Sequence, residues 1–181
     1  MIRKYIMNRY LKISLVAVIP CLVTIQSINA QNQEDIVLGK DTVCLAKNMY
    51  YESRNQGVAG QLAVSAVVLN RVNDNRFPNT ICEVVKQGPT RSSWKDPKIK
   101  IPVKHRCQFS WYCDGKSDKP KNKKLYETYL NLAESILLNE VPFPDITDGA
   151  TFYHADYVLP AWANQKTKTT EIEDHIFYRW E

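Results

Sequence analysis

Glu52 is the residue of this chain best placed for acid–base chemistry. It lies within residues 50–57 (YYESRNQG), where an amphipathic helix is expected to end and a glycine-containing turn to begin. Burial beside two tyrosines would disfavour the charged carboxylate, and an acid that keeps its proton near neutral pH has the profile of a glycosidase acid. A pKa of about 6 needs only about 2–3 kcal/mol of desolvation. The alternative is a helix-end Glu that is solvated or paired with Arg54, and these eight residues alone favour that alternative.

The helix that would carry Glu52 is one of four that apolar spacing and capping residues predict. Asp41 or Thr42 can cap it, and it runs to about Tyr51. A second helix is apolar nearly all round and therefore buried. A short third helix has a Thr80–Glu83 capping box. The second, third and fourth helices are expected over residues 61–73, 81–87 and 125–139.

The remaining segments are interpreted as loops and a small C-terminal sheet. Residues 150–154 and 172–180 have the composition of strands, and a polar stretch at residues 164–170 separates them. Residues 88–106 are expected to be a loop. The predicted fold class is α+β and mostly helical.

The first 30 residues predict a secretory signal peptide. A basic region precedes the apolar residues 13–25, and Ala30 ends a cleavage site. The apolar region is shorter than the about 20 residues of a membrane span, and Pro20 interrupts it; a retained signal anchor is the alternative. The protein is therefore expected to be periplasmic or secreted, with membrane contact only through this leader before cleavage.

Cleavage after Ala30 would change the charge of the chain. The full sequence has 24 Lys and Arg against 19 Asp and Glu, a formal charge of +5. The leader holds four of the cations and none of the acids, so 20 cations face 19 acids in the mature chain, a charge of +1. Nothing in this balance calls for a nucleic acid partner. About 150 residues remain, with a polar lead-in at residues 31–42 and one domain at residues 43–181.

Four cysteines remain after cleavage: Cys44, Cys82, Cys107 and Cys113. An even number in a secreted chain predicts disulfides, with three possible pairings. The expected bridges are Cys107–Cys113, which flank a short segment, and Cys44–Cys82; a bridge from Cys82 to Cys107 stays open as an alternative. Zinc is the competing interpretation, but the chain has no C-x2-C pair. No metal and no cofactor are expected.

An ordered set of segments covering residues 44–179 carries a family resemblance. The segments are 44–54 (CLAKNMYYESR), 60–64 (GQLAV), 68–72 (VLNRV), 77–80 (FPNT), 107–111 (CQFSW), 113–115 (CDG), 152–155 (FYHA), 162–163 (WA) and 175–179 (HIFYR). Together they resemble the SleB-type cell-wall hydrolase family, which includes spore-cortex-lytic enzymes. The resemblance implies a lysozyme-like domain that acts on the glycan strands of peptidoglycan. The catalytic glutamate of the family's Tyr-x-Glu-Ala-Arg-Gly-Glu pattern falls on Glu52.

Three departures from the family pattern lie close to the implied site. Ser53 and Asn55 replace the usual Ala and Gly, so the turn after Glu52 is altered. Gln56 replaces the second Glu of the pattern, which argues against an essential carboxylate at that position. Glu173 stands where Gly commonly precedes the C-terminal His-x-Phe.

Cleavage of a glycosidic bond needs an acid for the leaving oxygen, and often a second carboxylate. No second acid stands out, because the candidates lie in loops where Asp is ordinary: Asp74, Asp114, Asp148 and Asp156. A single acid suits lytic transglycosylation between N-acetylmuramic acid and N-acetylglucosamine. There the muramic acid 6-hydroxyl attacks and a 1,6-anhydro end forms. Hydrolysis remains open.

Several residues are candidates for holding the sugar. Gln108 and Ser110 could hydrogen-bond its polar groups and Phe109 could stack on a ring, unless Phe109 is core and Ser110 caps the next turn. Strand alternation would turn either Tyr153 or His154 toward a cleft, and we expect Tyr153.

The other basic residues are expected to have structural roles or to be solvated. Arg71 is expected to anchor a buried carboxylate, and the basic loops at residues 91–106 and 116–124 are more often solvated than bound to muramyl-peptide carboxylates. A monomer is assumed.

Two other classes of function compete with the glycosidase. One is a zinc amidase or peptidase of the cell wall that uses three histidines, although no H-E-x-x-H pattern is present: His105, His154 and His175. The other is a non-catalytic wall-binding domain, suggested by the altered turn at residues 53–56.

Overall fold

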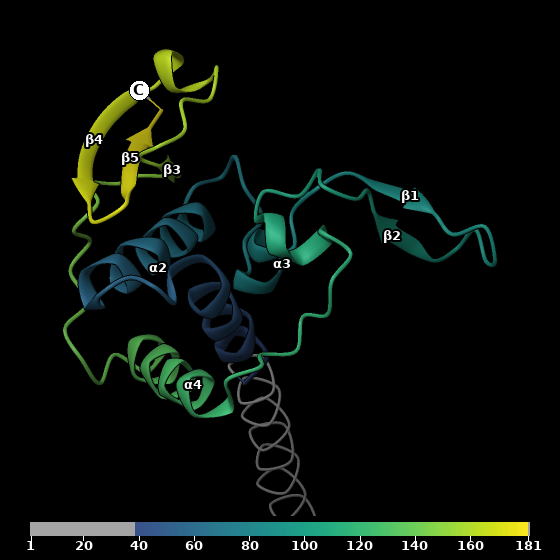
Figure 1. Ribbon diagram of the computed structural model, residues 1–181, viewed down its shortest axis with the longest axis horizontal. Coiled ribbons are helices and arrows are strands. Elements are labelled where there is room, and N and C mark those ends of the chain that lie inside the picture. Colours follow the sequence, from purple (N-terminus) through teal and green to yellow (C-terminus); the bar gives the residue numbers. More distant parts are fainter. Residues whose placement is uncertain (1–38, 181) are drawn as a thin grey trace, which may run out of the picture. The chain divides into compact units, whose positions relative to one another are not determined.

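The computed structural model describes residues 39–180 (Figure 1). The expected signal peptide and most of the polar lead-in therefore lie outside the described residues. Residues 39–42 are already helical, so Asp41 and Thr42 lie inside the first helix and neither is its N-cap. Within the described part, no helix is long and apolar enough to cross a membrane.

Two helices carry most of the buried apolar surface. The first, described over residues 39–53, buries Leu45, Met49 and Tyr50 on one face, as the spacing of its apolar residues predicts. Helix α2 (Val58–Asn73) is buried along much of its length. It begins at Val58 rather than at Gln61, so the turn between the two helices is shorter than predicted.

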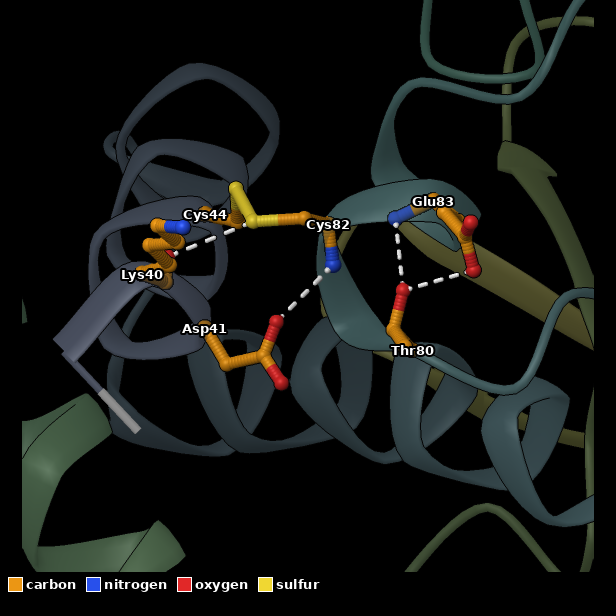
Figure 2. Close-up of a disulfide and its surroundings, with 6 residues drawn as sticks. All are labelled: Lys40, Asp41, Cys44, Thr80, Cys82 and Glu83. Carbon is orange, nitrogen blue, oxygen red and sulfur yellow. Dashed lines mark hydrogen bonds between the residues drawn. A yellow bond between two sulfur atoms is a disulfide. The ribbon is translucent and has the colours of Figure 1, made fainter. Parts of the chain in front are cut away.

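Short polar side chains start the other two helices. Thr80 caps α3 (Ile81–Val85), because its hydroxyl oxygen accepts from the Glu83 backbone N–H at 3.3 Å (Figure 2). The second half of the predicted capping box differs, since the Glu83 carboxylate accepts from the Thr80 hydroxyl and not from its backbone N–H. Asn122 caps α4 (Lys123–Leu137) through the Leu125 backbone N–H.

A three-stranded antiparallel sheet closes the chain. It consists of β3 (Phe152–Ala155), β4 (Thr167–Ile172) and β5 (His175–Arg179), in the order β3-β5-β4. Strand β5 lies within the strand predicted over residues 172–180, but it begins later, because Ile172 ends β4 and the chain turns at Glu173, whose φ is +51°. Strand β4 lies mostly in the stretch predicted as a polar connection, and its pairing with β5 holds it there.

The segment predicted as a loop at residues 88–106 contains a hairpin. Strands β1 (Thr90–Ser92) and β2 (Lys100–Pro102) pair antiparallel, and Figure 1 shows them extending away from the helices. Both strands are short and largely exposed, so they lack the apolar alternation that marks a strand in sequence.

Helix α2 is shared by two clusters of buried side chains. The larger cluster joins the first helix, α3 and α4 with Phe109 and Trp111. The smaller one packs Ala63 and Val67 of α2 against Phe177 of β5. The sheet and α4 therefore lie on opposite sides of α2 (Figure 1), and the predicted mostly helical α+β class is correct.

Both disulfides form with the predicted pairing. Cys44–Cys82 joins the first helix to α3 with a sulfur–sulfur distance of 2.03 Å (Figure 2). Beside it, the Asp41 carboxylate accepts from the Cys82 backbone N–H at 3.2 Å. Cys107–Cys113 closes the short segment that leads into α4.

Candidate functional site

The predicted site residues lie around one cleft. This central cleft has a volume of about 540 Å³ and lies where the first helix, the bridged segment 107–113 and strand β3 meet. All five predicted residues line it: Glu52, Gln108, Phe109, Ser110 and Tyr153. Segments more than 100 residues apart in the sequence therefore converge here.

Glu52 lies in the last turn of the first helix and is partly buried. Its carboxylate oxygen Oε2 accepts a hydrogen bond from the Tyr153 hydroxyl at 3.0 Å. Burial raises the pKa of Glu52, and this effect outweighs the lowering by the Tyr153 hydrogen bond and by the Arg71 charge. The protonated acid is thus favoured to a higher pH than for an exposed glutamate.

Tyr153 reaches Glu52 because side chains alternate along β3. Its ring packs against His175 and Phe177 with centroid distances of 5.0 and 5.7 Å. Burial and the neighbouring Glu52 raise the pKa of Tyr153 well above its usual value, so it remains a neutral donor. His154 is instead held by the Tyr178 hydroxyl at 3.0 Å. Only one of the pair is expected to face the cleft, whereas both Tyr153 and His154 line it; of the two, Tyr153 is the one that hydrogen-bonds Glu52.

Arg71 differs from its prediction. It does not anchor a carboxylate through a hydrogen bond: its Nε donates to the Thr151 carbonyl at 2.7 Å. The guanidinium lies against three aromatic rings, those of Phe77, Phe109 and Phe152, at 5.1 to 5.4 Å. Burial lowers the pKa of Arg71 to about 10, which still leaves a cation at neutral pH. Arg71 and Glu52 both line the central cleft, and the positive charge of Arg71 lowers the pKa of Glu52 by electrostatic attraction.

The bridged segment presents Gln108 and Ser110 to the cleft as exposed side chains. The Gln108 backbone N–H donates to the Gln87 carbonyl at 2.9 Å, which fixes the segment at its base. Phe109 is only 2% exposed and packs on Arg71. It therefore forms part of the floor, and the predicted stacking on a sugar ring is wrong for this residue.

Sequence reasoning missed Tyr157 and gave His175 only a metal-binding role. Tyr157 lines the same cleft and is 86% exposed, so its ring offers the face that Phe109 lacks. It follows β3 in an irregular segment, where no periodic pattern could have marked it. His175 begins β5, and burial lowers its pKa; its place in the family motif was the only signal.

Glu52 also lines a second opening. This turn-side hollow has a volume of about 300 Å³, and Tyr51, Arg54, Gln56 and Asp174 contribute to its lining together with Glu52. Tyr157 and His175 line both openings. Glu52 thus lines two adjoining openings.

Glu52 is the only Asp or Glu among the described residues that line the central cleft. In the turn-side hollow, the Asp174 carboxylate accepts from the Gln56 side-chain amide at 2.7 Å. Over residues 39–180, no three His, Cys, Asp or Glu side chains gather as possible metal ligands, so His105, His154 and His175 do not form a cluster.

Comparisons with known proteins agree on one family. The family model described as "Cell Wall Hydrolase" matches residues 55–178, a range that begins just after Glu52. A spore cortex-lytic enzyme of Bacillus cereus is 29% identical over 150 residues, which cover 82% of this chain and 46% of that protein. One from Halalkalibacterium halodurans is 27% identical over 138 residues, covering 76% and 34%. The chain spans less than half the length of these curated relatives.

Two solved catalytic domains have a similar fold. The catalytic domain of the Bacillus cereus SleB protein matches with a TM-score of 0.51 and 26% identity, over 77% of this chain and 91% of that one. The catalytic domain of the germination-specific lytic transglycosylase SleB from Bacillus anthracis matches with a TM-score of 0.52 and 27% identity, over 77% and 93%. The predicted lysozyme-like fold is therefore confirmed over nearly the whole of both domains.

Proposed function

Since the chain belongs to the cell wall hydrolase family, we propose that it degrades peptidoglycan, cleaving the glycan strand between N-acetylmuramic acid and N-acetylglucosamine as a lytic transglycosylase. The observation that carries the proposal is a single partly buried acid that lines two openings, with its pKa raised by burial. A raised pKa keeps a larger fraction of Glu52 protonated than an exposed glutamate would be at the same pH, and the protonated acid can donate to a leaving oxygen.

In the proposed reaction, Glu52 acts first as the general acid and then as the general base. Glu52 gives its proton to the glycosidic oxygen, the bond from that oxygen to C1 of the muramic acid breaks, and an oxocarbenium-like centre develops. The Glu52 carboxylate then takes the proton of the 6-hydroxyl as that oxygen bonds to C1. The products are a free N-acetylglucosamine 4-hydroxyl and a 1,6-anhydro ring, and Glu52 is protonated again.

Its neighbours suit Glu52 to both halves of this cycle. Burial favours the neutral acid before proton transfer, whereas the Tyr153 hydroxyl and the Arg71 charge stabilise the carboxylate that is left afterwards. A two-acid mechanism would place a second carboxylate at about 5 to 9 Å from the first. The lining of the central cleft offers Arg71, His175 and Tyr153 near Glu52 instead.

The remaining lining residues fit an amino sugar. Gln108 and Ser110 offer an amide and a hydroxyl for the acetamido and ring hydroxyl groups, and Tyr157 offers an exposed ring for stacking. In this arrangement the sugar on one side of the bond occupies the central cleft. The sugar on the other side occupies the turn-side hollow.

Glu52→Gln tests the proposal because it keeps the shape of the side chain and removes the transferable proton. Turnover on purified sacculi should fall by at least ~10²–10⁴-fold, while Glu127→Gln, an exposed carboxylate on α4, should leave it unchanged. Mass spectrometry of the wild-type digest should show 1,6-anhydro-muramic acid ends, one water lighter than reducing ends. Only reducing ends would replace this mechanism with hydrolysis, and free stem peptides with intact glycan would indicate an amidase.

A further inference from the structure

A larger hollow lies next to the turn-side hollow. This lysine hollow has a volume of about 870 Å³. One wall is aromatic, with Tyr50, Tyr51 and Trp111, and the other is the loop of residues 114–121 that leads into α4. The proposed mechanism places the two sugars in the central cleft and the turn-side hollow, and it assigns nothing to the lysine hollow.

The lysine hollow adjoins the site through two shared residues. Tyr51 and Arg54 line both this hollow and the turn-side hollow, and Tyr51 directly precedes Glu52 in the first helix. A substituent that leaves a sugar bound at Glu52 can therefore enter the lysine hollow along a continuous surface.

The aromatic wall is held in place by several contacts. The rings of Tyr51 and Trp111 stack with a centroid distance of 4.7 Å and an interplanar angle of 17°. Trp111 Nε1 donates to the Asn48 side-chain oxygen at 3.1 Å, and the Tyr50 hydroxyl accepts from the Asn122 backbone N–H at 3.1 Å. These contacts join the loop to the first helix, so that the hollow is built into the fold.

Cations outnumber carboxylates around the lysine hollow. Its charged lining consists of four cations and two acids: Arg54, Lys116, Lys119, Lys121, Asp114 and Asp118. Lys116 Nζ lies 3.8 Å from the Asp114 carboxylate, so the charges of these two residues offset each other. Three cations then remain against Asp118, whose pKa is raised by burial. The mature chain as a whole is close to neutral, so this excess is local.

We propose that the lysine hollow binds the acidic stem peptide of the substrate strand. The inference rests on the proposed function, because that peptide is attached through the lactyl group of the muramic acid whose bond Glu52 would cleave. Its free carboxylates match the exposed lysines, and its short aliphatic side chains match the partly exposed ring of Tyr51, which the buried Trp111 supports by stacking. The lysine hollow would thus favour strands that carry peptides over bare strands.

The test compares two substrates and two triple variants. Lys116→Ala/Lys119→Ala/Lys121→Ala removes three exposed cations from the lysine hollow. Lys98→Ala/Lys123→Ala/Lys124→Ala removes three equally exposed cations that do not line it. The substrates are sacculi that carry their peptides and the same glycan strands after enzymatic removal of the peptides. Thermal melting checks that both variants are folded.

The first variant should raise KM on peptide-bearing strands by roughly 3- to 100-fold, the range expected for three exposed ion pairs. Its KM on bare strands and its kcat on both substrates should stay at the wild-type values, and the control triple should match the wild type. An equal rise on both substrates, or no rise, would overturn the proposal. Neither result would contradict the proposed function, because that function is tested separately by the loss of turnover in Glu52→Gln.

Discussion

At Glu52, two opposing effects act on one carboxyl group. Burial raises its pKa, while the Tyr153 hydroxyl, 3.0 Å away, and the Arg71 guanidinium lower it. A general acid gains from this balance, because a carboxyl that is too hard to ionise cannot serve as the base in the second half of the reaction. In the proposed mechanism, Tyr153 would therefore act as a positioning residue that influences the working pH of Glu52.

Tyr153→Phe should shift the pH profile in a defined direction. Loss of the hydroxyl removes a hydrogen bond that favours the carboxylate, so the pKa of Glu52 rises further. Activity that needs the protonated acid is lost as pH rises through that pKa, and the alkaline limb of kcat/KM should therefore move up by about 1–2 pH units. Tyr157→Phe, also in the cleft but with no hydrogen bond to Glu52 among those of the described residues, is the control. A limb that stays in place or moves to lower pH contradicts this role for Tyr153.

Gln56, which replaces the second Glu of the family pattern, hydrogen-bonds to the turn beside it. Its side-chain amide donates to the Asp174 carboxylate at 2.7 Å, and its Oε1 accepts from the Asp174 backbone N–H at 3.2 Å. A Glu at this position would place a third carboxylate beside Asp174 and Glu173. The exchange of Glu for Gln thus suits the acidic turn of this chain, and it supports the expectation that no carboxylate is essential there.

Among the elements, α2 takes its N-terminal cap from a residue of the turn between β4 and β5. Gly57, its N-cap, has no side chain, and the Glu173 carboxylate accepts from the backbone N–H groups of Gly57 at 2.6 Å and Gly60 at 3.1 Å. A carboxylate at a helix N-terminus also interacts favourably with the helix dipole. Glu173 thereby ties the turn after Glu52 to the β4–β5 turn, and it explains why Glu replaces the common Gly.

Two substitutions separate the cap from the backbone conformation of Glu173. Its φ of +51° is unfavourable for Ala and acceptable for Gly. Glu173→Gly should cost about 1 kcal/mol of unfolding free energy through the lost cap, less the backbone strain that it relieves. Glu173→Ala loses the cap and keeps the strain, so urea denaturation should show it to be the least stable of the three, below both the wild type and the Gly variant. Two equally stable variants would show that backbone strain at this position is negligible.

The two disulfides should have different effects on stability and activity. In the chain-entropy model, the Cys44–Cys82 bridge, with a sequence separation of 38, contributes about 4 kcal/mol. The Cys107–Cys113 bridge, with a separation of 6, contributes about 2 kcal/mol. Removing the first pair with Ser should mainly lower the melting temperature. Removing the second should mainly lower activity, because it frees Gln108 and Ser110; the reverse ranking would contradict this assignment.

Which elements could be predicted depended on how much apolar pattern each one carries. The first helix, α2 and α4 have buried faces, and their spacing marked them. Strand β4 and the β1–β2 hairpin are polar and rely on backbone pairing with a neighbour, which leaves no periodic signal. Within the site, Gln108 and Tyr153 could be predicted from their motif neighbours. The exposed Tyr157 and the burial of Phe109 depend on tertiary packing that a single sequence does not encode locally.

For the molecule as a whole, the net charge depends on whether the basic leader is removed on export. The full chain has a formal charge of +5, whereas the chain from residue 31 onward has +1. A near-neutral enzyme is drawn only weakly to an acidic wall from a distance, so that binding would depend on local groups such as the cations proposed for the lysine hollow. This conclusion requires that the leader, which lies outside the described residues, is removed.

Export should therefore produce a protein that begins at Gln31. Expressed in a Gram-negative host, it should appear in the periplasm or medium, and intact mass and N-terminal sequencing should both place the cleavage after Ala30. Replacement of this small residue by a bulky one, Ala30→Tyr, should block cleavage and leave the full-length chain attached to the membrane. The described residues from Lys40 onward belong to one unit with its own core, so the cleaved form should retain full activity on sacculi. A wild-type protein that keeps its leader would instead establish the signal anchor, and the mature charge of +1 would no longer apply.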